Sequence, residues 1–78
     1  MNKGEKMYLN LKTEMMKMGI TIEEIASKLG LTRGTIFNKI EGKTPLTYDE
    51  AMAIKDLFFP YADLQWLFKK INRNKEND

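Results

Sequence analysis

The segment TIEEIASKLGLTRGTIFNKIE, from Thr21 to Glu41, constrains the fold more than any other part of this chain. Ala26 is small enough for a second helix to pack close against the first, and Gly30 can adopt the left-handed conformation that ends a helix without strain. Ile36 then lies where the second helix must bury an apolar side chain. The segment therefore predicts two short helices that cross steeply through a tight turn.

The helix limits follow from local capping signals. Thr21 is a good N-cap with Glu24 three residues later, which is a capping-box pattern, and Thr32 caps the next helix, which runs to about Glu41. Apolar residues recur two to five positions apart, and within each expected helix they follow the spacing that helical packing requires. They are Ile25, Leu29, Leu31, Ile36 and Ile40.

This segment resembles the helix-turn-helix of small phage repressor and Cro-type DNA-binding proteins, the XRE-like family. The following stretch, EGKTPLTYDEAMAIKDLFFP, resembles the segment after the recognition helix in small regulators of Gram-positive phages and mobile elements. The likeness covers roughly Leu9 to Phe68. It implies a lambda-repressor-like domain that binds double-stranded DNA.

The resemblance also implies which residues contact base edges, because they match the family's base-contacting positions: Arg33, Gly34, Phe37 and Asn38. Arg33 can donate to guanine O6 and N7, and Asn38 can pair with adenine N6 and N7. The alternative for Arg33 is a phosphate contact or a solvated charge. Gly34 either permits close approach to the groove or is a harmless substitution, and Phe37 either touches a thymine methyl group or is partly buried.

Phosphate contacts are expected from helix ends and the following loop, at Thr21, Thr32, Thr35, Lys43 and Thr44. Lys28 and Lys39 are expected to be solvated. The family usually has a polar residue, often Gln, at the position of Ile22, and Ile22 cannot replace its phosphate contact. The family's basic–acidic pair between the first helix and the end of the third corresponds to Lys12 and Glu41.

The charge distribution agrees with a DNA-facing surface. The formal net charge is only +2, but residues 1–43 hold eight basic against five acidic residues, whereas residues 44–78 hold five against six. A mildly basic half that carries the motif fits a phosphate-facing surface. Solvated faces of mixed charge would give a similar count.

The whole chain predicts an all-α domain of five helices and no strands. The first helix is expected from about Glu5 to Met18. A fourth is capped by Thr47 and stopped by Pro60, and a fifth is capped by Asp63 and extends to Ile71. We expect one compact domain over residues 1–71 and a polar tail over 72–78. The expected core comprises Leu11, Met15, Ile25, Ala26, Leu29, Leu31, Ile36, Ile40, Ile54 and Leu57.

Aromatic residues crowd the C-terminal part of the domain: Phe58, Phe59, Tyr61, Trp66 and Phe68. They exceed what one helix face can bury, and aromatics are enriched in interfaces. We therefore expect a homodimer through Phe59, Tyr61 or Trp66, which would match palindromic half-sites.

Composition limits the other functions. The chain has no Cys and no His, so thiolate chemistry and the commonest general base and metal ligand are absent. We expect no enzyme, no cofactor, no metal site and no small-molecule substrate. The start MNKGEKMYLN has no apolar signal region and no run reaches membrane-spanning length, so a cytoplasmic, non-membrane protein is expected.

Two functions remain open at this point. The first is a sequence-specific transcription regulator, a Cro-type repressor that binds a phage or mobile-element operator as a dimer. The alternative is a protein-interaction module, such as an antitoxin or antirepressor, that uses the same fold. The aromatic C-terminal segment and the low net charge favour the alternative, whereas Arg33 and Asn38 favour DNA binding.

Overall fold

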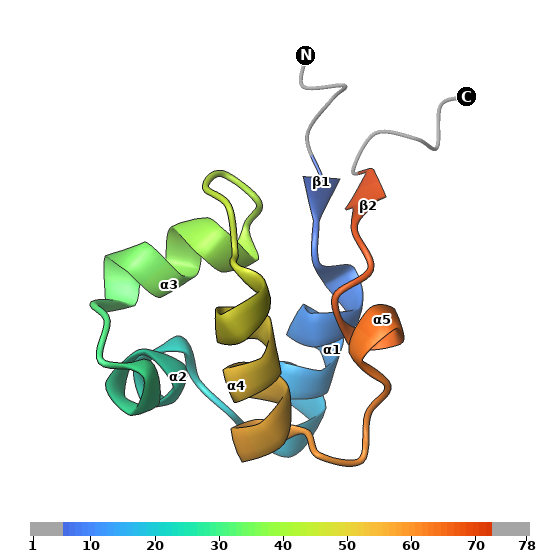
Figure 1. Ribbon diagram of the computed structural model, residues 1–78, viewed down its shortest axis with the longest axis horizontal. Coiled ribbons are helices and arrows are strands. Elements are labelled where there is room, and N and C mark those ends of the chain that lie inside the picture. Colours follow the sequence, from blue (N-terminus) through green and yellow to red (C-terminus); the bar gives the residue numbers. More distant parts are fainter. Residues whose placement is uncertain (1–5, 73–78) are drawn as a thin grey trace.

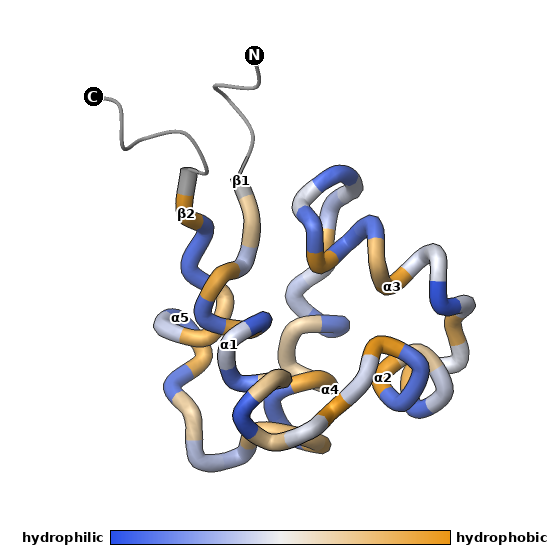
Figure 2. Tube along the Cα trace, turned by 180° about the vertical axis from the view of Figure 1, so that it is seen from behind, coloured by the Kyte–Doolittle hydropathy of each residue, from blue (hydrophilic) through white to orange (hydrophobic). Residues whose placement is uncertain are grey.

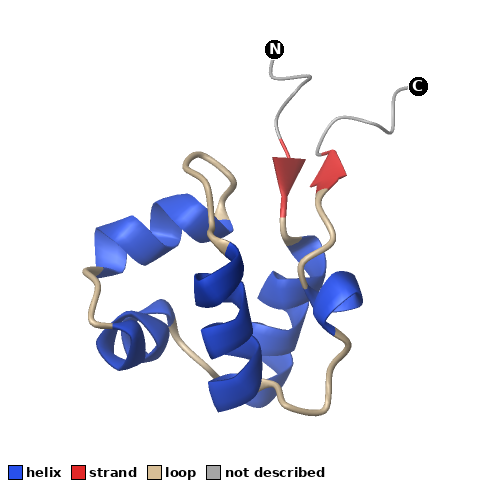
Figure 3. Cartoon of the chain, viewed as in Figure 1, coloured by secondary structure: helices blue, strands red, loops and turns tan. Residues whose placement is uncertain are grey.

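The computed structural model describes residues 6–72 and is built almost entirely from helices (Figure 3). Its helices are α1 (Leu9–Met18), α2 (Ile22–Leu29), α3 (Arg33–Ile40), α4 (Tyr48–Phe58) and α5 (Leu64–Leu67). The expected all-α fold with five helices is confirmed. None of the helices in residues 6–72 has the length and apolar character needed to cross a bilayer.

The helix ends follow the local signals. Thr21 and Thr47 each form a capping box, with Glu24 and Glu50 respectively. The Thr32 side chain accepts the backbone N–H of Thr35, and Asp63 accepts that of Trp66. These interactions satisfy backbone donors that a helix leaves without an internal partner.

The arrangement of the helices separates two regions (Figure 1). α2 and α3 lie on one side of α4, and α1 and α5 lie toward the other. Blue and orange alternate along the helical tube in Figure 2, as expected for helices with one apolar face. The buried cluster joins both regions and consists of Tyr8, Leu11, Met15, Ile25, Ala26, Ile36, Ile40, Ile54, Phe59, Ala62 and Leu67.

The core differs from the expected one at α4 and beyond. Leu57 was expected inside, but it is 55 % exposed, whereas Phe59 is fully buried. Ile54 is buried on the inner face of α4, and Leu57 lies one turn further toward the helix end, at the edge of that face. Phe59 follows the last helical residue with φ −135°, so it leaves the helical path and turns inward.

The ends of the domain differ as well. Lys6–Met7 (β1) and Ile71–Asn72 (β2) pair antiparallel, with Met7 opposite Ile71. The expected first helix therefore begins later, at Leu9, and its expected start at Glu5 lies outside the described residues. The fifth helix ends at Leu67, because the chain extends to reach β1. Apart from Asn72, the expected polar tail also lies outside the described residues.

Candidate nucleic-acid interface

α2 and α3 are joined by the three residues Gly30–Thr32. Gly30 is left-handed with φ 72°, and the Leu31 N–H donates to the Ala26 carbonyl at 2.9 Å. Ala26 is 4 % exposed and Ile36 is fully buried. The expected tight turn, small packing residue and inward isoleucine are confirmed.

The side of α3 away from the core carries the four residues expected to contact bases. Arg33 and Gly34 are exposed in the first turn, and Phe37 and Asn38 follow one turn later with half-buried side chains. The spacing places all four on neighbouring positions of one helix surface. Ile36 and Ile40 are buried and face the core.

Asn38 forms hydrogen bonds to the following loop through its backbone carbonyl, not through its side chain. Its carbonyl accepts the Lys43 N–H at 2.9 Å and the Thr44 N–H at 3.4 Å, which fixes the loop after α3. Within residues 6–72 the side-chain amide of Asn38 has no hydrogen bond to another residue. Its donors and acceptor are therefore available to a ligand that approaches α3.

Arg33 is held by Glu23, which sequence reasoning did not identify. The Arg33 Nε–H donates to Glu23 Oε2 at 2.7 Å across the turn, and both side chains are more than half exposed. The pKa of Glu23 is lowered, chiefly by this hydrogen bond and then by one from its own backbone N–H. The available signal in the sequence was opposite charges in the first turns of the two helices, Glu23 in α2 and Arg33 in α3.

Gly34 and Phe37 differ in how the fold constrains them. A Cβ atom at Gly34 would meet no atom within 4 Å, so the packing of the domain does not require glycine there. Phe37 is half-buried but is not part of the core cluster, and Lys43 Nζ lies 5.8 Å from its ring centroid. The ring and the ammonium group thus lie together at the C-terminal end of α3.

Three of the four threonines expected to contact phosphate, Thr21, Thr32 and Thr35, already form hydrogen bonds at the start of a helix. The backbone N–H of Thr21 donates to Glu24 Oε1 at 2.8 Å, so it is not available to a phosphate. The Thr32 and Thr35 hydroxyl groups lie 2.9 Å apart in a hydrogen bond of their own. A phosphate accepts hydrogen bonds, so it would need the one hydroxyl hydrogen that this pair leaves free.

The loop after α3 is anchored by Lys39, which was expected to be solvated. Its side chain is only 14 % exposed; Nζ donates to the Pro45 carbonyl at 2.9 Å and pairs with Glu50 Oε1 at 3.1 Å. The pKa of Glu50 is lowered, first by the Thr47 backbone N–H and also by Lys39. The anchored loop leaves Lys43 and Thr44 exposed beside the end of α3.

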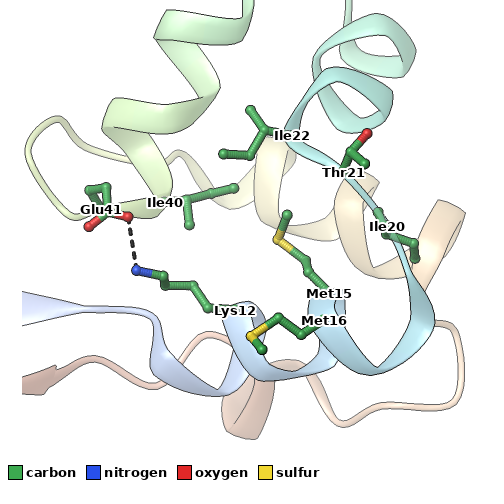
Figure 4. A pocket seen from close by; sticks show the side chains of 8 residues that line it. All are labelled: Lys12, Met15, Met16, Ile20, Thr21, Ile22, Ile40 and Glu41. Carbon is green, nitrogen blue, oxygen red and sulfur yellow. Dashed lines mark hydrogen bonds and ion pairs between the residues drawn. The ribbon is translucent and has the colours of Figure 1, made fainter.

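Ile22 contributes to an apolar hollow rather than to a polar surface. The hollow has a volume of about 280 Å³, and the side chains of Met15, Ile22 and Ile40 converge in it (Figure 4). The expected pair of Lys12 and Glu41 is present at its edge, with Nζ and Oε2 2.9 Å apart. This pair ties α1 to the end of α3.

The three residues expected in a dimer interface lie in different environments. Phe59 is fully buried within its own protomer, so its ring is not available to a second copy and this expectation was wrong. Tyr61 is 60 % exposed, but its hydroxyl group donates to Glu14 Oε1 at 2.8 Å. Trp66 is 45 % exposed and remains a candidate.

Comparison with protein-family models, with curated proteins and with solved structures gives no significant match. In residues 6–72, no three acidic, His or Cys side chains come together in a way that could hold a metal ion.

Proposed function

We propose that this protein is a sequence-specific DNA-binding regulator that lays α3 in the major groove. The proposal rests on the side-chain amide of Asn38 on α3, which forms no hydrogen bond with any other residue within 6–72. Asn is a mediocre helix former in this position, so helix propensity does not account for it. An amide at a recognition helix can pair with both N6 and N7 of adenine.

The neighbouring residues support the same surface. Arg33 projects four terminal N–H donors beyond its contact with Glu23, and these match the acceptors of guanine. Lys43 and Thr44 extend from the anchored loop, where they would contact phosphates on the wall of the groove. Base contacts by α3 and phosphate contacts by the loop would then act together.

The mechanism in this proposal is occlusion of a promoter. Two copies would cover two half-sites of a phage or mobile-element operator and block polymerase, as a Cro-type repressor does. A dimer through the surface around Trp66 would give the two-fold symmetry that palindromic half-sites require. Such a protein acts in the cytoplasm, where the DNA is.

The test begins with binding-site selection on random duplex DNA. On the selected site, Asn38→Ala should weaken binding by about 1–3 kcal/mol and relax the preference at one base pair. Lys43→Ala should weaken binding to selected and random DNA alike and reduce the slope of log K against log salt by about one. Gln65→Ala, an exposed amide on α5, is the matched control and should change neither.

The alternative remains a protein-interaction module such as an antitoxin or antirepressor. Met16, which is 82 % exposed, and Trp66 favour it because large exposed apolar side chains suit a protein partner. If the wild-type protein shows no salt-dependent DNA binding, or if Asn38→Ala and Lys43→Ala leave it unchanged, this alternative is the better account.

A further inference from the structure

Arg33 and Glu23 meet through one particular nitrogen. The 2.7 Å hydrogen bond is made by Nε of the guanidinium, and no hydrogen bond of its two terminal amino groups lies within residues 6–72. A guanidinium reads guanine with two parallel N–H donors in a fixed plane. Contact at Nε therefore restrains the orientation of the guanidinium group, and its four terminal N–H donors stay available.

The position of Glu23 at the start of α2 favours a charged carboxylate. Glu23 lies in the first turn of α2, between the two capping-box residues Thr21 and Glu24. A carboxylate there interacts favourably with the positive end of the helix. The hydrogen bond from Arg33 is the largest cause of the lowered pKa of Glu23 and so favours its charged form. The group that holds Arg33 is thus fixed to a rigid element.

The pair contributes little to holding the fold together. The Arg33 side chain is 59 % exposed and that of Glu23 is 64 % exposed, and exposed ion pairs are screened by water and salt. Because the pair joins the N-terminal ends of α2 and α3 at the surface, we expect removal of Glu23 to leave the buried Ala26 and Ile36 contacts intact. A stability role does not explain the arrangement.

We propose that Glu23 is a positioning residue that orients the Arg33 guanidinium and so sets the preference of α3 for one guanine. The inference rests on the proposed DNA-binding function and adds a residue outside α3 to its specificity. Glu23 also places a negative charge near the DNA backbone. It therefore opposes binding to random sequences while it favours the sequence that Arg33 can read.

The experiment measures binding to the selected site and to the same site with the Arg33-dependent base pair replaced. In Glu23→Ala, the preference between the two DNAs should fall by about threefold to tenfold, while binding to random DNA stays equal or becomes tighter. Glu23→Gln keeps an oxygen that can accept the Nε–H, so it should retain part of the preference. In an Arg33→Ala background, Glu23→Ala should leave the preference unchanged.

Two controls separate positioning from other effects. Asp56→Asn removes a negative charge from an exposed position on α4, and it should leave the base preference unchanged. Thermal unfolding of Glu23→Ala should match that of the wild type, which excludes a folding defect.

Several results would overturn the inference. If Arg33→Ala removes the preference but Glu23→Ala leaves it intact, the DNA-binding function stands and the positioning role fails. If Glu23→Ala strengthens binding to the selected site more than to the altered one, Glu23 competes with DNA for Arg33 instead of orienting it. If the wild type binds no DNA, the positioning role fails together with the proposed function.

Discussion

Lys12 on α1 and Glu41 at the C-terminal end of α3 are joined by an ion pair of 2.9 Å. The Glu41 side chain is 15 % exposed and that of Lys12 is 33 % exposed, so the pair is partly shielded from water. It closes one side of the apolar hollow between α1, α2 and α3 (Figure 4). The pair therefore helps to fix α3, and with it the candidate DNA-binding surface, relative to the rest of the domain.

Lys12→Met should lower the free energy of unfolding by about 1 kcal/mol, because it removes the charged donor but keeps an apolar stem of similar length. For a domain of this size, that corresponds to a melting temperature about 4–8 °C lower. Lys28→Met, at an exposed position of α2, is the control and should stay close to the wild type. Equal melting temperatures for the two variants would show that the pair does not stabilise the fold.

Tyr61→Phe should destabilise the protein at neutral pH and have less effect in acid. The Tyr61 hydroxyl group is the largest cause of the lowered pKa of Glu14, and the same hydrogen bond raises the pKa of Tyr61. A carboxyl whose folded-state pKa is lowered stabilises the fold above its unfolded pKa, and this contribution is lost as pH falls through the folded pKa.

The difference in melting temperature between wild type and Tyr61→Phe should therefore shrink as pH falls from 7 to below about 4. Tyr48→Phe is the matched control, because Tyr48 is 68 % exposed at the start of α4. A difference that stays constant over this range would assign the effect of Tyr61 to packing of its ring alone.

Gly34→Ala should stabilise the protein and weaken its binding to DNA. Nothing in the domain occupies the space of the new methyl group, so replacing glycine in α3 should add up to about 1 kcal/mol to the free energy of unfolding. The same methyl group would hold α3 away from the groove wall. Unfolding in denaturant and titration with the selected DNA measure the two effects separately.

Gly30→Ala provides the contrast for this prediction. The space at Gly30 is also open, but its φ of 72° disfavours alanine, so this variant should lose about 1–2 kcal/mol. If Gly34→Ala is more stable and binds DNA as well as the wild type, close approach to DNA at Gly34 is rejected.

Trp66→Ala should weaken a homodimer. Trp66 is exposed on α5, and its backbone contacts with Asn10 and Asp63 do not depend on the indole ring. Sedimentation of the wild type at tens of micromolar should show a dimer, and Trp66→Ala should raise its dissociation constant by about tenfold or more. Leu57→Ala, which truncates another exposed apolar side chain, is the control. A wild-type protein that is monomeric both free and on DNA would contradict a dimer interface at Trp66.

The sequence alone determined where α2, α3 and α4 begin and the turn between α2 and α3. Thr21 with Glu24 and Thr47 with Glu50 form the expected capping boxes, and Gly30 has the expected left-handed conformation. These features depend on residues within one helical turn of each other, so a local pattern is sufficient to predict them. The inward positions of Ile36 and Ile40 followed from helical periodicity for the same reason.

The tertiary structure decided two things: the direction of side chains just beyond a helix end, and which charged groups from different helices form ion pairs. Phe59 turns inward because it follows the end of α4, where helical periodicity no longer fixes the direction of a side chain. Glu23 reaches Arg33, and Lys39 reaches Glu50, because the two turns bring separate helix ends together. Such contacts depend on the relative placement of whole helices, and no spacing within one helix determines that placement.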